Sequence, residues 1–110
     1  MNPVISRNGV PVRLTDERWV HIVENHDDLA GKRDAILEAI ADPDFVLTGT
    51  REELLAVRYG EKPRVIVVVY REMAQTDGFI ITAFETSRVR QLIKTRKMLW
   101  KKRQSKRHSA

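Results

Sequence analysis

The stretch RVIVVVYREM, residues 64–73, decides the fold expected for this chain, because it contains the longest apolar run in the sequence. Valine and isoleucine dominate it, and β-branched side chains favour strands. A continuous apolar run of this length is typical of a strand whose two faces are both covered. We therefore predict a central strand here, and the run is far too short to span a membrane.

Three more segments are rich in β-branched and aromatic residues and also read as strands. They are DFVLTGT (44–50), ELLAVRYG (53–60) and GFIITAFETS (78–87). The connections between the four segments are only a few residues long. Short connections favour antiparallel neighbours, so we predict a four-stranded meander.

Apolar residues at helical spacing predict helices on both sides of these strands. The first helix follows PVRLT, with Thr15 or Asp16 as its cap, and the second is KRDAILEAIADP (32–43). RVRQLIKTRKMLWKKR (88–103) predicts a final helix. The predicted fold class is α+β, with two N-terminal helices packed on a four-stranded antiparallel meander and a basic C-terminal helix. Residues 1–104 are predicted to form one domain, followed by a basic flexible tail at 105–110.

The net charge of +5 hides a sharp asymmetry along the chain. Residues 1–87 carry all 15 acidic side chains and a net charge of −5, whereas residues 88–110 carry ten Lys or Arg and no acid. In the predicted final helix, a stripe at i, i+4, i+7, i+11 is formed by Arg90, Lys94, Lys97 and Lys101. A basic block of this kind binds polyanions or acidic partners, or else it is simply solvated. We predict that the stripe binds an RNA backbone.

The stretch WVHIVENHDDL (19–29) holds two of the three histidines. At spacing i, i+5 they diverge by about 140° around a helix, so His21 and His26 are not expected to share a metal ion. His26 lies on the apolar face at the end of the helix, which suits either core packing or proton transfer. His21 is expected to face solvent, and His108 is expected to be incidental. No cysteine is present, and neither a metal site nor a cofactor is predicted.

The predicted strands offer a second group of polar side chains. If they share one face, a guanidinium and three hydroxyls would gather there, from Arg58, Tyr70, Thr82 and Thr86. Such a face suits a phosphodiester, because arginine binds phosphate with two parallel hydrogen bonds. The alternative is that Arg58 pairs with a surface acid and that the others are ordinary strand residues. The register between strands cannot be read from the sequence.

Several motifs together resemble a known family of small bacterial and phage proteins. They are TDERWVHIVENHDDL, ELLAVRYG, VIVVVYRE, GFIITAFETSR and KMLW, spread over residues 11–100. The family is assigned to the barnase–EndoU–colicin–RelE-like nuclease superfamily. The resemblance implies N-terminal helices on a four-stranded meander and metal-independent cleavage of RNA, often by toxins that an antitoxin neutralises. The matching site positions are His26, Arg58 and Thr82 or Thr86, with Tyr70 as a further candidate. Asp27 stands where a proline often follows the helix histidine.

We therefore expect a cytoplasmic, metal-independent endoribonuclease, a toxin that cleaves RNA by attack of the ribose 2′-OH on the adjacent phosphate. His26 would be the acid or base, Arg58 would stabilise the phosphate charge, and Tyr70, Thr82 and Thr86 would position the substrate. No glutamate stands on that face in an obvious general-base position. The expected partner is RNA, with a cognate antitoxin protein as a further candidate, and no membrane is expected. The alternatives are a non-catalytic RNA-binding module and a protein-interaction domain whose basic helix docks an acidic partner.

Overall fold

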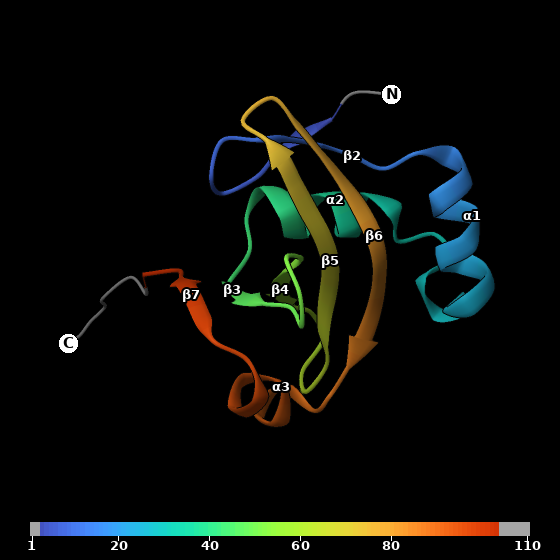
Figure 1. Ribbon diagram of the computed structural model, residues 1–110. Coiled ribbons are helices and arrows are strands. Elements are labelled where there is room, and N and C mark those ends of the chain that lie inside the picture. Colours follow the sequence, from blue (N-terminus) through green and yellow to red (C-terminus); the bar gives the residue numbers. More distant parts are fainter. Residues whose placement is uncertain (1–2, 104–110) are drawn as a thin grey trace.

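The computed structural model describes residues 3–103, which form one curled sheet flanked by helices (Figure 1). Across these residues the sheet has seven strands in the order β1-β2-β6-β5-β4-β3-β7. The strands are β1 (Val4–Ile5), β2 (Pro11–Arg13), β3 (Phe45–Thr48), β4 (Leu54–Tyr59), β5 (Val65–Ala74), β6 (Asp77–Thr86) and β7 (Met98–Lys101). Neighbouring strands are antiparallel except for β2 and β6, which are parallel.

The valine-rich strand β5 lies at the centre of this sheet, between β4 and β6. Val65 and Val67 pack into one hydrophobic cluster, whereas Ile66, Val68 and Tyr70 pack into another. Both faces of β5 are therefore buried, as its continuous apolar sequence predicts.

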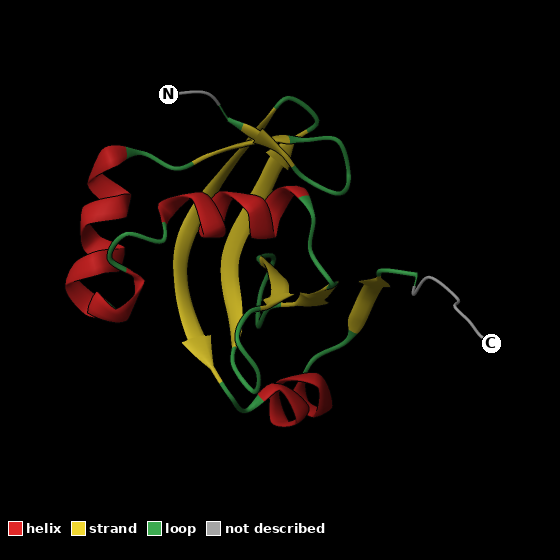
Figure 2. Cartoon of the chain, turned by 180° about the vertical axis from the view of Figure 1, so that it is seen from behind, coloured by secondary structure: helices red, strands yellow, loops and turns green. Residues whose placement is uncertain are grey.

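Two helices cover one face of the sheet, and Figure 2 shows α2 (Arg33–Ala41) crossing that face. The helix α1 (Asp16–Asn25) begins where the Thr15 hydroxyl accepts a hydrogen bond from the Arg18 N–H, at 3.1 Å. A single 3₁₀ turn, η1 (Asp27–Leu29), joins it to α2. The short helix α3 (Val89–Thr95) packs Val89 and Leu92 against the opposite face. Within residues 3–103 no helix is long and apolar enough to cross a membrane.

The prediction of two N-terminal helices on a four-stranded meander is wrong. Within residues 3–103 the sheet has seven strands, and two of them precede the helices. The β1–β2 hairpin adds to the sheet at β6, where Val12 lies opposite Gly78. This pairing is tight, because a Cβ on Gly78 would lie 3.3 Å from the Val12 side chain and 3.4 Å from the carbonyl oxygen of Pro11, both in β2. The joint between β2 and β6 depends on contacts distant in the sequence, and for this reason local patterning did not reveal it.

The predicted C-terminal helix over residues 88–103 is also wrong. The helix ends at Thr95, Arg96 adopts an extended conformation, and β7 then pairs with β3. The Thr48 N–H donates to the Lys97 carbonyl at 2.9 Å, and the Lys102 N–H donates to the Asp44 carbonyl at 2.8 Å. Without β7 the apolar strand β3 would be an uncovered edge, so pairing outweighs the helix propensity of this segment, although Arg, Lys, Met and Leu are good helix formers.

The curl of the sheet brings its two ends together. Arg7, in the turn of the β1–β2 hairpin, stacks on the ring of Trp100 in β7 with its guanidinium carbon 4.5 Å from the ring centre. These residues belong to opposite ends of the strand order. The contact is a cation–π interaction of the kind arginine makes with tryptophan.

Candidate functional site at the end of β6

Within residues 3–103, most of strand β6 has no strand on its outer side. Among the described residues, β2 pairs with β6 only at Gly78 and Phe79. Beyond that point α1 and η1 pack along β6 instead. His26, the residue that ends α1, therefore lies beside Phe84, with 6.3 Å between the ring centres. The helix end thus places an imidazole at the uncovered edge of the strand.

The carboxylate of Glu85, one residue further along β6, gathers two cations from distant segments. Its side chain is only 10% exposed, and it accepts a hydrogen bond from the Lys32 ammonium at 2.9 Å. The Arg64 guanidinium lies 3.5 Å from Glu85 and 3.3 Å from Asp28 of η1. Because a shielded carboxylate is costly without partners, these two cations compensate for the burial of Glu85. We call Glu85, Lys32, Arg64 and Asp28 the Glu85 cluster.

A shallow pocket of about 160 Å³ lies on the other face of the same strand end. Its lining residues are Phe84, Thr86, Arg88, Gln91, Leu92 and Thr95. The Thr86 hydroxyl oxygen accepts a hydrogen bond from the backbone N–H of Arg88 at 3.0 Å, which orients the hydroxyl. Phe84 is the residue common to the pocket and the His26 contact.

The four strand residues singled out in the sequence do not share a face. Arg58 pairs through Ile66 with Glu85, and Tyr70 belongs to the cluster covered by α2. Thr82 is opposite Val69 and Thr86 is opposite Val65, and both valines pack on the other side of the sheet. Thr82 and Thr86 are therefore separated from Arg58 and Tyr70 by the sheet itself.

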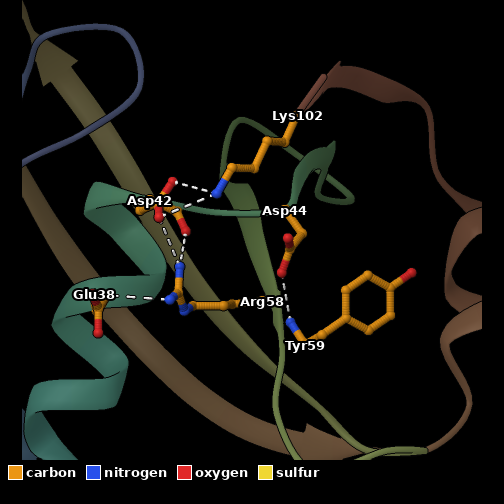
Figure 3. Close-up of polar contacts among 6 residues, drawn as sticks. All are labelled: Glu38, Asp42, Asp44, Arg58, Tyr59 and Lys102. Carbon is orange, nitrogen blue, oxygen red and sulfur yellow. Dashed lines mark hydrogen bonds and ion pairs between the residues drawn. The ribbon is translucent and has the colours of Figure 1, made fainter. Parts of the chain in front are cut away.

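Arg58 is held by carboxylates at the end of α2 (Figure 3). Its Nη1 donates to the Asp42 carbonyl oxygen at 2.5 Å and to the Asp42 carboxylate at 3.0 Å, while Nη2 lies 3.9 Å from Glu38. Lys102 also donates to Asp42, at 3.1 Å. Hydrogen bonds from Lys102 and then Arg58 hold the pKa of Asp42 below its ordinary value. We call Arg58, Asp42, Glu38 and Lys102 the Asp42 cluster.

Tyr70 lies in the core, with a relative exposure of 1%. Burial, and to a smaller extent the charge of Glu72, raise the pKa of its phenol well above the ordinary range. The hydroxyl therefore stays neutral, and its position is closed to a macromolecular substrate. Thr82 is partly buried in the middle of β6 and, unlike Thr86, does not line the pocket.

The predicted stripe of four cations is divided in two. Arg90 and Lys94 lie on α3, next to the pocket at the end of β6. Lys97 follows the helix, and Lys101 lies on β7 at the far edge of the sheet. The even spacing seen in the sequence required a continuous helix, which ends at Thr95.

The sequence reading missed Glu85, Lys32 and Arg64 as site residues. Glu85 lies on the face of β6 opposite Thr82, and its cationic partners come from segments 53 and 21 residues away in the sequence. Alternation failed elsewhere in β6, because the register shifts between Val69 and Tyr70 and leaves Ile81 as an extra residue. The available signal for Glu85 was an acid directly after the largely apolar run from Phe79 to Phe84.

Within residues 3–103 no three His, Asp or Glu side chains are grouped so that they could hold a metal ion. Comparison of the chain with family models, with curated proteins and with solved structures gives no match.

Proposed function

We propose that this chain is a metal-independent endoribonuclease that cleaves at the end of β6. The observation that carries the proposal is the Glu85 cluster, a shielded carboxylate bound by two cations and next in β6 to Phe84, whose ring lies against His26. A carboxylate, an imidazole and cations at one edge supply a proton acceptor, a proton donor and charge stabilisation. These are the three requirements for cleavage by an adjacent 2′-OH.

The reaction assigns a role to each of these groups. Glu85 accepts the proton of the ribose 2′-OH as that oxygen attacks phosphorus. The bond from phosphorus to the 5′ oxygen breaks, and protonated His26 donates a proton to the leaving oxygen. The products are a 2′,3′-cyclic phosphate and a 5′-hydroxyl end. Lys32 and Arg64 stabilise the charge that builds on the phosphate oxygens.

The cations now bound to Glu85 can move to the phosphate. Lys32 and Arg64 have side chains that are 44% and 50% exposed, so an incoming phosphate reaches them from solvent. Their transfer from the carboxylate to the phosphate frees Glu85 to accept the proton. Arg88, Arg90 and Lys94 surround the adjoining pocket and would hold the RNA backbone without reading its sequence.

The resemblance to toxin nucleases extends the proposal to cells, where expression of the chain is expected to stop growth. In this assignment Arg58 and Tyr70 support the fold, and Thr86 is the threonine near the substrate. The sequence predicted that Arg58 stabilises the charge on the phosphate. In this proposal Arg64 and Lys32 do so instead.

The direct test is incubation of the purified full chain with an end-labelled single-stranded RNA in EDTA. We expect products with a 2′,3′-cyclic phosphate and a 5′-hydroxyl, and no cleavage of the same oligonucleotide with 2′-deoxyribose. His26→Ala is expected to reduce the rate by about two orders of magnitude. His21→Ala is the matched control, because His21 is an exposed residue on the same helix.

Two outcomes contradict the proposal. Binding of RNA without any product from the wild-type chain would assign a non-catalytic RNA-binding role. Loss of thermal stability in His26→Ala with an unchanged rate for the folded fraction would make His26 a packing residue.

A further inference from the structure

The proposed function leaves three exposed cations at β7 without a role. Lys97, Lys101 and Arg103 are exposed, and none of them takes part in the ion pairs found among residues 3–103. In the strand order β7 is four strands from β6, so these cations belong to a different part of the sheet from the Glu85 cluster.

Strand β7 is also an open edge of the sheet. Among the described residues it pairs with β3 alone, so every second residue directs its N–H and C=O groups to the side away from β3. Figure 1 shows β7 at the margin of the sheet with no other strand beyond it. Met98 and Leu99 on this strand are 37% and 48% exposed. The edge thus offers hydrogen-bonding backbone, apolar side chains and positive charge together.

We propose that the free edge of β7 binds an extended acidic segment of a partner protein, which adds to the sheet as a further strand. Backbone hydrogen bonds would supply affinity, as in other cases of strand addition. Acidic side chains opposite Lys97 and Lys101 would supply selectivity, since oppositely charged cross-strand pairs are favourable. The proposal does not depend on nuclease activity.

Two other occupants fit the free edge of β7 less well: a second copy of β7 and single-stranded RNA. Two copies of β7 would place lysines close to lysines, and like charges across a strand pair are destabilising. Single-stranded RNA favours exposed aromatic rings on which its bases stack. The ring of Trp100, the aromatic residue of β7, is already covered by Arg7 at 4.5 Å. An acidic strand is the occupant that fits both the backbone and the charge.

The test uses the full chain and a fluorescent peptide of alternating glutamate and valine. Anisotropy at low salt is expected to show binding of this peptide, and no binding of a peptide with lysine in place of glutamate. The fully N-methylated acidic peptide has the same charge but no N–H donors, and we expect it to bind at least about tenfold more weakly. Amide shifts by NMR should be confined to β7 and its neighbours.

The protein variant to compare is Lys97→Glu combined with Lys101→Glu. We expect about a tenfold or greater loss of affinity for the acidic peptide. Lys94→Glu is the matched control on α3, and it should affect peptide binding far less. RNA cleavage, if present, should survive the double variant.

Three results would overturn the proposal: no binding of the acidic peptide, equal binding of the N-methylated peptide, or displacement of the peptide by single-stranded RNA. The last would assign the β7 cations to an RNA surface. A failure of nuclease activity alone would leave the peptide results standing, so the two proposals fail separately.

Discussion

The Glu85 cluster and the Asp42 cluster lie at the two ends of one row across the sheet. Glu85 is opposite Ile66, which is opposite Arg58, so the two ends are about 10 Å apart. Each cluster pairs two carboxylates with two cations. In the first the most shielded group is an acid, Glu85 at 10% exposure, whereas in the second it is a base, Arg58 at 31%.

The two shielded groups, Glu85 and Arg58, have different kinds of partner. We use this difference to propose a chemical role for the first cluster and a structural role for the second. Arg58 donates to a backbone carbonyl as well as to carboxylates, and Lys102 joins the same acid from the far end of the chain. The Asp42 cluster therefore ties α2, β4 and the residue after β7 together. Among the described residues, Glu85 is bound by Lys32 and Arg64, whose side chains are 44% and 50% exposed, and its neighbour Phe84 contacts His26 and lines the pocket. Similar ion pairs thus stabilise the fold in one cluster and, in our proposal, serve chemistry in the other.

The largest expected effect tests this separation through the two carboxylates. Glu85→Gln keeps the shape of the side chain but removes the proton acceptor, so RNA cleavage should fall by about two orders of magnitude. Asp42→Asn makes the same chemical change in the other cluster and should leave the rate of the folded protein within a few-fold. Single-turnover cleavage in EDTA measures both. Equal losses in the two variants would remove the distinction between the clusters.

The second expected effect concerns stability. Arg58→Ala removes hydrogen bonds to the Asp42 backbone and carboxylate, and should lower the free energy of unfolding by about 1–2 kcal/mol. The matched control is Arg13→Ala, which breaks an ion pair with Asp77 whose side chains are 57% and 47% exposed. Such a surface pair contributes about 0–1 kcal/mol. Urea denaturation followed by circular dichroism compares them.

The cleavage rate of the same Arg58→Ala protein distinguishes between a structural role for this arginine and a role in binding phosphate. The architectural role predicts an unchanged rate for the folded fraction. A cleavage rate lower by about two orders of magnitude, without a change in stability, would mean that Arg58 binds the phosphate, as the sequence suggested.

The parts of the fold that the sequence predicted are those that local composition determines. Strand β5 is apolar throughout, so its central position followed from burial on both faces. The N-terminus of α1 followed from the cap at Thr15. In contrast, Met98, Leu99 and Trp100 suit a helix as well as a strand, and their pairing with β3 joins segments about 50 residues apart in sequence.

The candidate site was predicted only in part, for the same physical reason. His26 at the end of a helix could be found from periodicity, and it does lie at the edge of the sheet. Arg58 looked suited to a phosphate because its partner Asp42, on another element, was not visible. Glu85 looked ordinary because Lys32 and Arg64 come from separate loops. Cross-strand register and partner choice are tertiary properties that no local pattern contains.

The smallest expected effect is the acid dependence of stability at Asp42. Hydrogen bonds from Lys102 and Arg58 lower the pKa of Asp42 in the folded protein below the ordinary value of 3.8. A carboxyl group with a lowered folded pKa stabilises the fold fully above its unfolded pKa, and the contribution is lost as the pH falls through the folded value. Because the side chain is half exposed, we expect less than about 1 kcal/mol.

The measurement is the difference in unfolding free energy between the wild-type chain and Asp42→Asn. Above about pH 4.5 the difference should be constant, and it should shrink as the pH falls below 3.8. Lys102→Met removes the larger cause of the lowered pKa of Asp42 and leaves Arg58 in place. At acid pH its stability curve should therefore approach that of Asp42→Asn. A difference that persists unchanged to pH 2 would mean that Asp42 stabilises the fold by its shape and hydrogen bonds, and that its charge contributes nothing to the joint between α2 and the end of β7.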